Sequence, residues 1–318
     1  MSTGLLDLSP DSTIVKIYTT PLFYAIFTKS KDIGSFKWLI LNHTFWIIAE
    51  ETLVALVKPV FLSPYLAIYQ VGFFSDADFT LTVIFVLLFL GVFFNALAGI
   101  MITIYNRYTV FLSSKWQRIL RGKWAIFAIV ALHVICLSSG FIYLVPIITR
   151  SPEYFCTEAV HQNPEFAYFI NQSSFVFASL KDYLYGLRIC IGGFISFYVG
   201  CFLSIGIFLY QLHKNYQAHY INDEVQRSLI VLALVQLFTA SFFAIGLPLA
   251  VLSFYAFEIE NTATATLIIF IIECTYGPLD IVATLYFIVP YRRFIAEIIF
   301  RRKRIQEIPH ISIIRNKP

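Results

Sequence analysis

Apolar residues along the chain gather in seven stretches that are separated by short polar connections. A helix needs about 20 mostly apolar residues to cross a hydrocarbon core of about 30 Å. All stretches but the first reach that length comfortably; the first is short and contains Lys16. The pattern predicts seven transmembrane helices, at roughly Thr13–Phe27, Trp38–Leu62, Phe79–Tyr105, Trp124–Thr149, Leu187–His213, Ser228–Tyr255 and Thr262–Ile288.

The composition agrees with a membrane protein. Hydrophobic residues make up 58% of the 318 residues, charged residues only 13%, and the mean hydropathy is +0.75, well outside the range of soluble globular domains. The seven stretches and their connections leave no room for a soluble domain of ordinary size. We therefore expect an all-α membrane protein: a seven-transmembrane helix bundle over residues 1–289, followed by a basic cytoplasmic tail over residues 290–318.

The distribution of positive charge predicts the orientation in the membrane. Most of the 23 Lys and Arg residues lie in the first, third and fifth connections and in the tail. By the positive-inside rule these segments are cytoplasmic, so the N-terminus is expected outside. The net charge of +4 then reflects a basic inner surface, and nucleic acid is not an expected partner.

The start of the tail has helical periodicity. Apolar and basic residues alternate over Tyr291–Arg304, where Phe294, Ile295, Ile298 and Ile299 supply an apolar face. This pattern predicts a short amphipathic helix that lies on the anionic inner leaflet of the bilayer.

Motifs for catalysis or metal binding are absent from the sequence. It contains no His-Glu-x-x-His, no Gly-x-Ser-x-Gly, no phosphate-binding glycine loop and no Cys-x-x-Cys, so we expect no enzyme, no cofactor and no metal site. The long connection after the fourth span, on the predicted outer side, holds a glycosylation acceptor at Asn171. Cys156 lies in the same connection, and the top of the third span offers no cysteine to pair with it.

Four carboxylates fall inside predicted spans: Glu50 and Glu51 in the second, and Glu273 and Asp280 in the seventh. A charge at the bilayer centre is costly, so each should face the bundle or water. Glu273 and Asp280 are seven residues apart and should share a helix face. The four carboxylates could line a ligand cavity or form a protonation-linked switch, or they could only fix helix packing; packing is the favoured interpretation for Glu273, as it is for the intramembrane His133.

Several ordered motifs resemble a known receptor family. Phe36–Asn42 and Thr44–Trp46 are similar to the entry of the second span in nematode serpentine chemoreceptors of the Srh type, a branch of the Str, Srh, Sri and Srd superfamily. Tyr105–Tyr108 resembles the family's Glu-Asn-Arg-Tyr motif after span three, with Tyr105 in place of the acid. Gly277 to Arg292 resembles the signature that ends span seven in Pro-Tyr-Arg.

The resemblance implies a G-protein-coupled receptor for a small environmental molecule, such as an odorant, in the plasma membrane of chemosensory neuron cilia. Its partners would be that ligand, a heterotrimeric G protein and the lipid bilayer. The ligand would bind among spans three, five, six and seven and shift the population toward an inward-open form. The residues implied to contact the G protein are Arg107, Tyr108, Arg118, Arg292 and Arg293.

A transporter or ion channel is the alternative function. In that interpretation Glu50, Glu51, Glu273 and Asp280 form a cation path through the membrane. The lack of an internal repeat and the odd number of spans argue against it.

Overall fold

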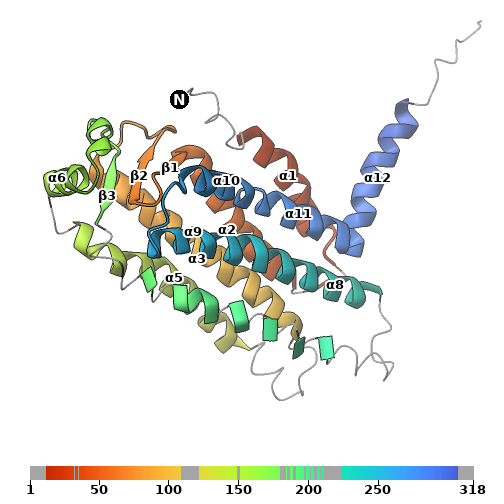
Figure 1. The fold of residues 1–318 in the computed structure, drawn as a ribbon. Coiled ribbons are helices and arrows are strands. Elements are labelled where there is room, and N and C mark those ends of the chain that lie inside the picture. The colour runs from red at the N-terminus through yellow and green to blue at the C-terminus, as the bar shows by residue number, and fades with distance from the viewer. Residues whose placement is uncertain are drawn as a thin grey trace, which may run out of the picture.

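The computed structural model is an elongated bundle of helices that run side by side (Figure 1). It describes residues 12–31, 33–34, 36–108, 122–148, 151–179, 184, 187–188, 191–196, 198–200, 202–203, 206–207, 209–210 and 224–306. The long helices of the bundle are α1 Ser12–Thr28, α2 Phe36–Val57, α3 Phe79–Tyr108, α5 Lys123–Ile148, α8 Glu224–Thr239, α9 Leu247–Ala256, α10 Ala263–Glu273 and α11 Tyr276–Phe287.

Within the described residues, four helical segments are long and apolar enough to cross a membrane. They are Phe36–Val57, Phe79–Asn106, Arg227–Ala256 and Ala263–Phe287. They correspond to the predicted spans two, three, six and seven. The predicted fourth span is the apolar helix α5, the first is the 17-residue helix α1, and only parts of the fifth lie within the described residues.

The bundle is held together by apolar contacts and by small residues that let helices approach closely. A Cβ atom added at Gly99 of α3 would lie 3.1 Å from Cα of His43 in α2, and one at Gly91 would lie 3.3 Å from Cα of Leu137 in α5. Helix backbones can come this close only where one side chain is missing. Large apolar side chains such as Trp124 and Phe127 of α5 are exposed at 72% and 66%, as expected for a surface that faces lipid.

One end of the bundle carries a compact cap that the all-α prediction did not contain. A small antiparallel sheet is formed by β1 Pro59–Phe61, β2 Leu66–Gln70 and β3 Val176–Ala178, in the order β1-β2-β3. Helix α6 Pro152–Gln162 and the 3₁₀ helix η3 Pro164–Tyr168 lie beside it (Figure 1). The cap has its own apolar core around Phe166 and Phe177, and it is built from the connections predicted to be outside.

The predicted second span is wrong at its C-terminal end, because α2 stops at Val57 and not at Leu62. Lys58 has a φ of 47° and precedes Pro59, which begins β1. A residue before proline is disfavoured in the α region, and proline has no N–H to continue a helix. The proline was visible in the sequence and marks the boundary.

Spans six and seven are both irregular near their middle. In span six the chain forms a π helix, η4 Ala240–Gly246, between α8 and α9. In span seven, α10 ends at Glu273 and α11 begins at Tyr276. Between them the Thr275 N–H donates to the carbonyl of Ile272, three residues earlier, which is the bond of a 3₁₀ turn and not of an α-helix. Pro278 cannot donate to the carbonyl of Cys274, which explains the break in span seven.

The predicted tail helix is present as α12 Val289–Gln306, which turns away from α11 at the end of the bundle opposite the cap (Figure 1). Ile288 is extended and ends α11. Tyr291 is fully buried, its hydroxyl lies 2.6 Å from that of Ser30, and Phe294 stacks on Tyr24 at 5.1 Å. Burial raises the pKa of Tyr291 to about 12, against the opposing effect of the hydrogen bond with Ser30, so the hydroxyl stays protonated and joins α12 to the end of α1.

Candidate functional site

A cavity lies inside the bundle between α2, α3, η4 and the two halves of span seven. Its volume is about 30 Å³, which is room for about two water molecules. Ile47 and Val54 mark its extent along α2, and Phe89 and Ile100 its extent along α3. Unlike the predicted ligand site, it is lined by span two, and its described lining contains no residue of span five.

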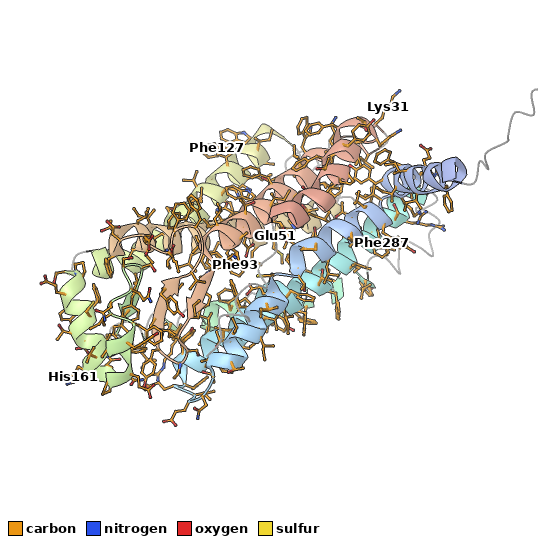
Figure 2. The ribbon with its side chains drawn as sticks, turned by 90° about the horizontal axis from the view of Figure 1, so that it is seen from above. Lys31, Glu51, Phe93, Phe127, His161 and Phe287 are labelled. Carbon is orange, nitrogen blue, oxygen red and sulfur yellow. The ribbon has the colours of Figure 1, made fainter. Side chains whose placement is uncertain are left out.

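Three of the four predicted intramembrane carboxylates meet at this cavity. Glu50 and Glu51 approach from α2, and Glu273 approaches from the end of α10. Figure 2 shows Glu51 in the middle of the bundle, close to Phe93 of α3, which also lines the cavity. The sequence placed these glutamates inside the membrane; that they come together follows only from the packing of α2 against span seven.

Gly277 allows the side chain of Glu51 in α2 to lie close to the backbone of α11. A Cβ atom added there would lie 1.9 Å from the Oε1 atom of Glu51, which is far inside van der Waals contact. The Glu51 side chain, 7% exposed, therefore lies directly on the first turn of α11. The glycine of the Gly-Pro motif in span seven thus has a packing role that the sequence alone did not reveal.

Aromatic rings form much of the remaining wall. Phe89, Phe93, Phe270 and Tyr276 all line the cavity, and Tyr276 stacks on Phe243 of η4 at 6.1 Å. The Tyr276 hydroxyl is buried and has no hydrogen-bond partner within the described residues. An unsatisfied buried hydroxyl costs free energy, so this atom is suited to a polar occupant of the cavity.

Asp280 does not share the cavity with Glu273, although the two residues are seven positions apart on the same span. The break between α10 and α11 separates them, and Asp280 belongs to a second polar cluster. Its Oδ1 atom accepts a hydrogen bond from Gln236 of α8 at 3.0 Å, and its Oδ2 atom lies 3.7 Å from Nδ1 of His43 in α2. The prediction that Glu273 and Asp280 share a helix face, and with it one site, is therefore wrong for the site: Glu273 lines the cavity and Asp280 does not.

The partners of Asp280 link three spans in the half of the bundle away from the cap. Asp280 is 2% exposed, His43 1% and Gln236 4%. The Gln236 amide also lies 3.5 Å from the hydroxyl of Thr284. The sequence analysis did not assign His43 or Gln236 to a site. The spacing of His43, Ile47 and Glu50, which places them on one face of α2, was the available signal.

A third polar cluster explains His133. Its Nδ1–H donates a hydrogen bond to Oδ1 of Asn95 in α3, and its Nε2 accepts one from the amide nitrogen of Asn42 in α2 at 3.2 Å. Trp46 stacks on the ring at 5.3 Å. The favoured interpretation of His133 was structural, and these contacts, which join α2, α3 and α5, agree with it.

The residues predicted to contact a G protein fall at the end of the bundle opposite the cap. Arg107 and Tyr108 are the last two residues of α3. Arg292 and Arg293 are exposed in the first turn of α12. Arg118 lies outside the described residues.

The predicted outer connection carries the modification candidates. Asn171 is exposed in a turn between η3 and β3. Cys156 of α6 is a free cysteine, and burial raises the pKa of its thiol, which keeps the thiol protonated and weakly nucleophilic.

The fold and the family comparison together define the class of protein. A mostly helical bundle with several apolar helices long enough to span a bilayer is a multi-pass membrane protein. Within the described residues, no three His, Cys, Asp or Glu side chains are placed to hold a metal ion.

The particular family follows from the sequence comparison. Residues 12–301 match the model of the family described as serpentine type 7TM GPCR chemoreceptor Srh. The chain therefore belongs to the Srh family of chemoreceptors, as its motifs predicted. Neither the curated proteins nor the solved structures include a significant match to this chain.

Proposed function

We propose that this chemoreceptor binds a small environmental molecule in the cavity between spans two, three, six and seven and activates a heterotrimeric G protein. The observation that carries the proposal is the family match over residues 12–301. The cavity supports it, because polar and aromatic groups converge there around a hollow inside an apolar bundle. The orientation we propose puts the N-terminus outside and α12 in the cytoplasm.

The irregular segments of spans six and seven support a mechanism of population shift. Ala244 of η4 and Cys274 at the break in span seven both line the cavity. A ligand there touches the two places where these helices depart from regular geometry. Local π geometry is frequent at functional sites, and a ligand shifts an equilibrium only by binding one form better than the other.

The Asp280 cluster provides the route from the cavity toward the cytoplasmic end. Gln236 of α8 in span six and Asp280 of α11 in span seven are hydrogen-bonded. A movement of α11 is therefore transmitted to α8, and the reverse. In the inward-open form we propose that the inner ends of spans three, five and six separate. The G protein then contacts Arg107, Tyr108 and Arg118, with Arg292 and Arg293 at the edge of the contact.

The cellular setting follows from the family. We propose that the receptor lies in the plasma membrane of a chemosensory neuron, in its cilia. Residues 1–289 would form the receptor domain, and residues 290–318 the tail whose first part, α12, lies on the inner leaflet.

A cell assay tests the proposal. The receptor is expressed with G protein in heterologous cells, exposed to a broad panel of volatile and water-soluble chemicals, and compared with Arg107→Ala and with Lys31→Ala, a control that removes another cation of the same predicted face. We expect a chemical-dependent signal that Arg107→Ala removes and Lys31→Ala retains. No response across the panel in surface-expressed receptor, or equal signals in the two variants, would contradict the proposed function or the role of Arg107 respectively.

A further inference from the structure

The chemistry of the cavity wall specifies the kind of molecule that the cavity can bind. Its polar groups are the carboxylates of Glu50, Glu51 and Glu273 and the hydroxyl of Tyr276. Within the described part of the chain, no Lys, Arg or His lines the cavity. Among the described residues, the wall therefore offers negatively charged hydrogen-bond acceptors and no positively charged side chain.

The carboxylates of Glu50 and Glu273, which line the same cavity, need positive charge nearby. Like charges within a few ångströms repel strongly in a medium of low dielectric constant, and a bare carboxylate inside a membrane is costly. Protons or a bound cation can relieve the repulsion. The unpartnered hydroxyl of buried Tyr276 favours a bound species, because protonation of the glutamates leaves that hydroxyl unsatisfied.

The rest of the wall favours an organic cation over a metal ion. The faces of aromatic rings attract ammonium groups, and Phe89, Phe93 and Phe270 line the same cavity as the carboxylates. Aliphatic side chains such as Val54 cover alkyl groups but offer no ligands to a metal. The described residues also place no three acidic or other metal-binding side chains in a metal-holding arrangement.

We propose that the cavity binds the ammonium group of a primary alkylamine, with its nitrogen beside Glu50 and Glu273. An alkylammonium group has three N–H donors, enough for the carboxylates of Glu50 and Glu273 and for the oxygen of the Tyr276 hydroxyl, which accepts the third hydrogen bond. The alkyl chain extends toward Phe270. This inference rests on the proposed function, because it names the ligand class of the receptor.

The size of the cavity sets the limits of the ligand. A volume of about 30 Å³ accommodates an ammonium head and about one methylene group in place of two waters. A longer alkyl chain displaces the rings of Phe270 and Tyr276, which lie on either side of the break in span seven. Ligand length is therefore coupled to the geometry of that break, and affinity rises with chain length only as far as the rings can move.

The test is a thermal-unfolding measurement on purified full-length receptor in detergent at pH 7. The probes are protonated alkylamines from methylamine to hexylamine, each paired with the alcohol of the same chain length. We expect an amine to raise the unfolding temperature in a saturable way, and the matched alcohol to leave it unchanged. Because this comparison uses only the wild-type protein, it does not depend on a variant folding.

Variants then locate the site. Glu50→Gln and Glu273→Gln each remove one charge, and each is expected to weaken amine binding by about tenfold to a hundredfold, as the loss of a hydrogen bond to a charged group does. Glu165→Gln is the matched control, since Glu165 is exposed in the outer cap, and it should bind amines as wild type does.

Two results would overturn the inference. One is an equal shift with amines and alcohols, and the other is unchanged amine binding in folded Glu50→Gln and Glu273→Gln. The failure of the proposed function is separate: a receptor that drives G-protein signalling with neutral chemicals but binds no amine keeps its function and loses this ligand class. A receptor that binds amines through these glutamates supports the site whatever its signalling.

Discussion

At the scale of single residues, the account depends on where a few polar side chains are held. Glu51 occupies the space that a side chain at position 277 would need, and Asp280 is fixed by Gln236 and His43. The sequence identified the four intramembrane carboxylates because charge in an apolar stretch is conspicuous. It could not divide them into two clusters, since that division depends on a break of only two residues in span seven.

Gly277→Ala should destabilise the receptor by about 1–3 kcal/mol, because the new methyl group overpacks against the Glu51 carboxylate. Gly193→Ala is the matched control: nothing lies within 4 Å of its Cβ position, so only helix propensity changes. Thermal unfolding in detergent compares the two. Adding Glu51→Ala to Gly277→Ala should recover part of the loss; a Gly277→Ala protein as stable as wild type would refute the close approach.

Gln236→Leu should reduce stability by about 1 kcal/mol, since hydrogen bonds between membrane helices have this magnitude. It removes the donor to the buried Asp280 carboxylate. In a double-mutant cycle with Asp280→Leu, we expect a coupling energy between the two positions. Thr239→Val, whose hydroxyl donates to Val235 within its own helix, should show no coupling with Asp280→Leu; equal coupling for both would argue against the cluster.

At the scale of elements, prolines decide where helices end or bend. Pro59 ends α2, and Pro278 accounts for the break between α10 and α11. The sequence predicted helices well because long apolar stretches are the strongest signal in a membrane protein. It missed the sheet of the cap, because strands of three to five residues are too short to show a clear alternation of apolar and polar residues.

Pro278→Ala tests the break in span seven. Alanine restores an N–H for the Cys274 carbonyl, so span seven should become more regular and the protein more stable to heat. If the break is part of the response to ligand, the chemical-evoked G-protein signal should fall at equal surface expression. Pro152→Ala, at the first position of α6, where proline fits a helix, should change neither measurement; a full signal from Pro278→Ala would remove the break from the mechanism.

At the scale of the whole molecule, the described structure has two unlike ends. One end carries the cap of strands and α6, and the other carries α12 with exposed Arg292 and Arg293 (Figure 1). Charge alone predicts which of these ends faces the cytoplasm, because the positive-inside rule needs no three-dimensional information; that orientation stays a prediction. The meeting of α2, α3 and span seven around one cavity was not predictable. Which helices are neighbours depends on side-chain packing in three dimensions, and that packing cannot be deduced from the apolar pattern of a single sequence.

Glycosylation tests the orientation. Asn171 is exposed in the cap, so an outside cap predicts a glycan there that Asn171→Gln removes, seen as a faster-migrating band after expression in cells. The sequence also contains Asn42-His43-Thr44, an acceptor motif that lies within α2. Thr44→Val destroys this motif and should leave the band unchanged. If the band is lost with Thr44→Val and kept with Asn171→Gln, the predicted orientation is inverted.

The central claim is that a ligand in the bundle activates a G protein at the end opposite the cap. The most direct measurement is nucleotide exchange on purified G protein by the receptor in lipid nanodiscs, with and without a chemical that the cell assay identifies. The account predicts ligand-dependent exchange that is lost in Arg107→Ala while ligand binding persists. Ligand binding with no exchange in the wild-type receptor would contradict it, and cation flux through the reconstituted protein, abolished by neutralising Glu50 and Glu273, would point to a channel instead.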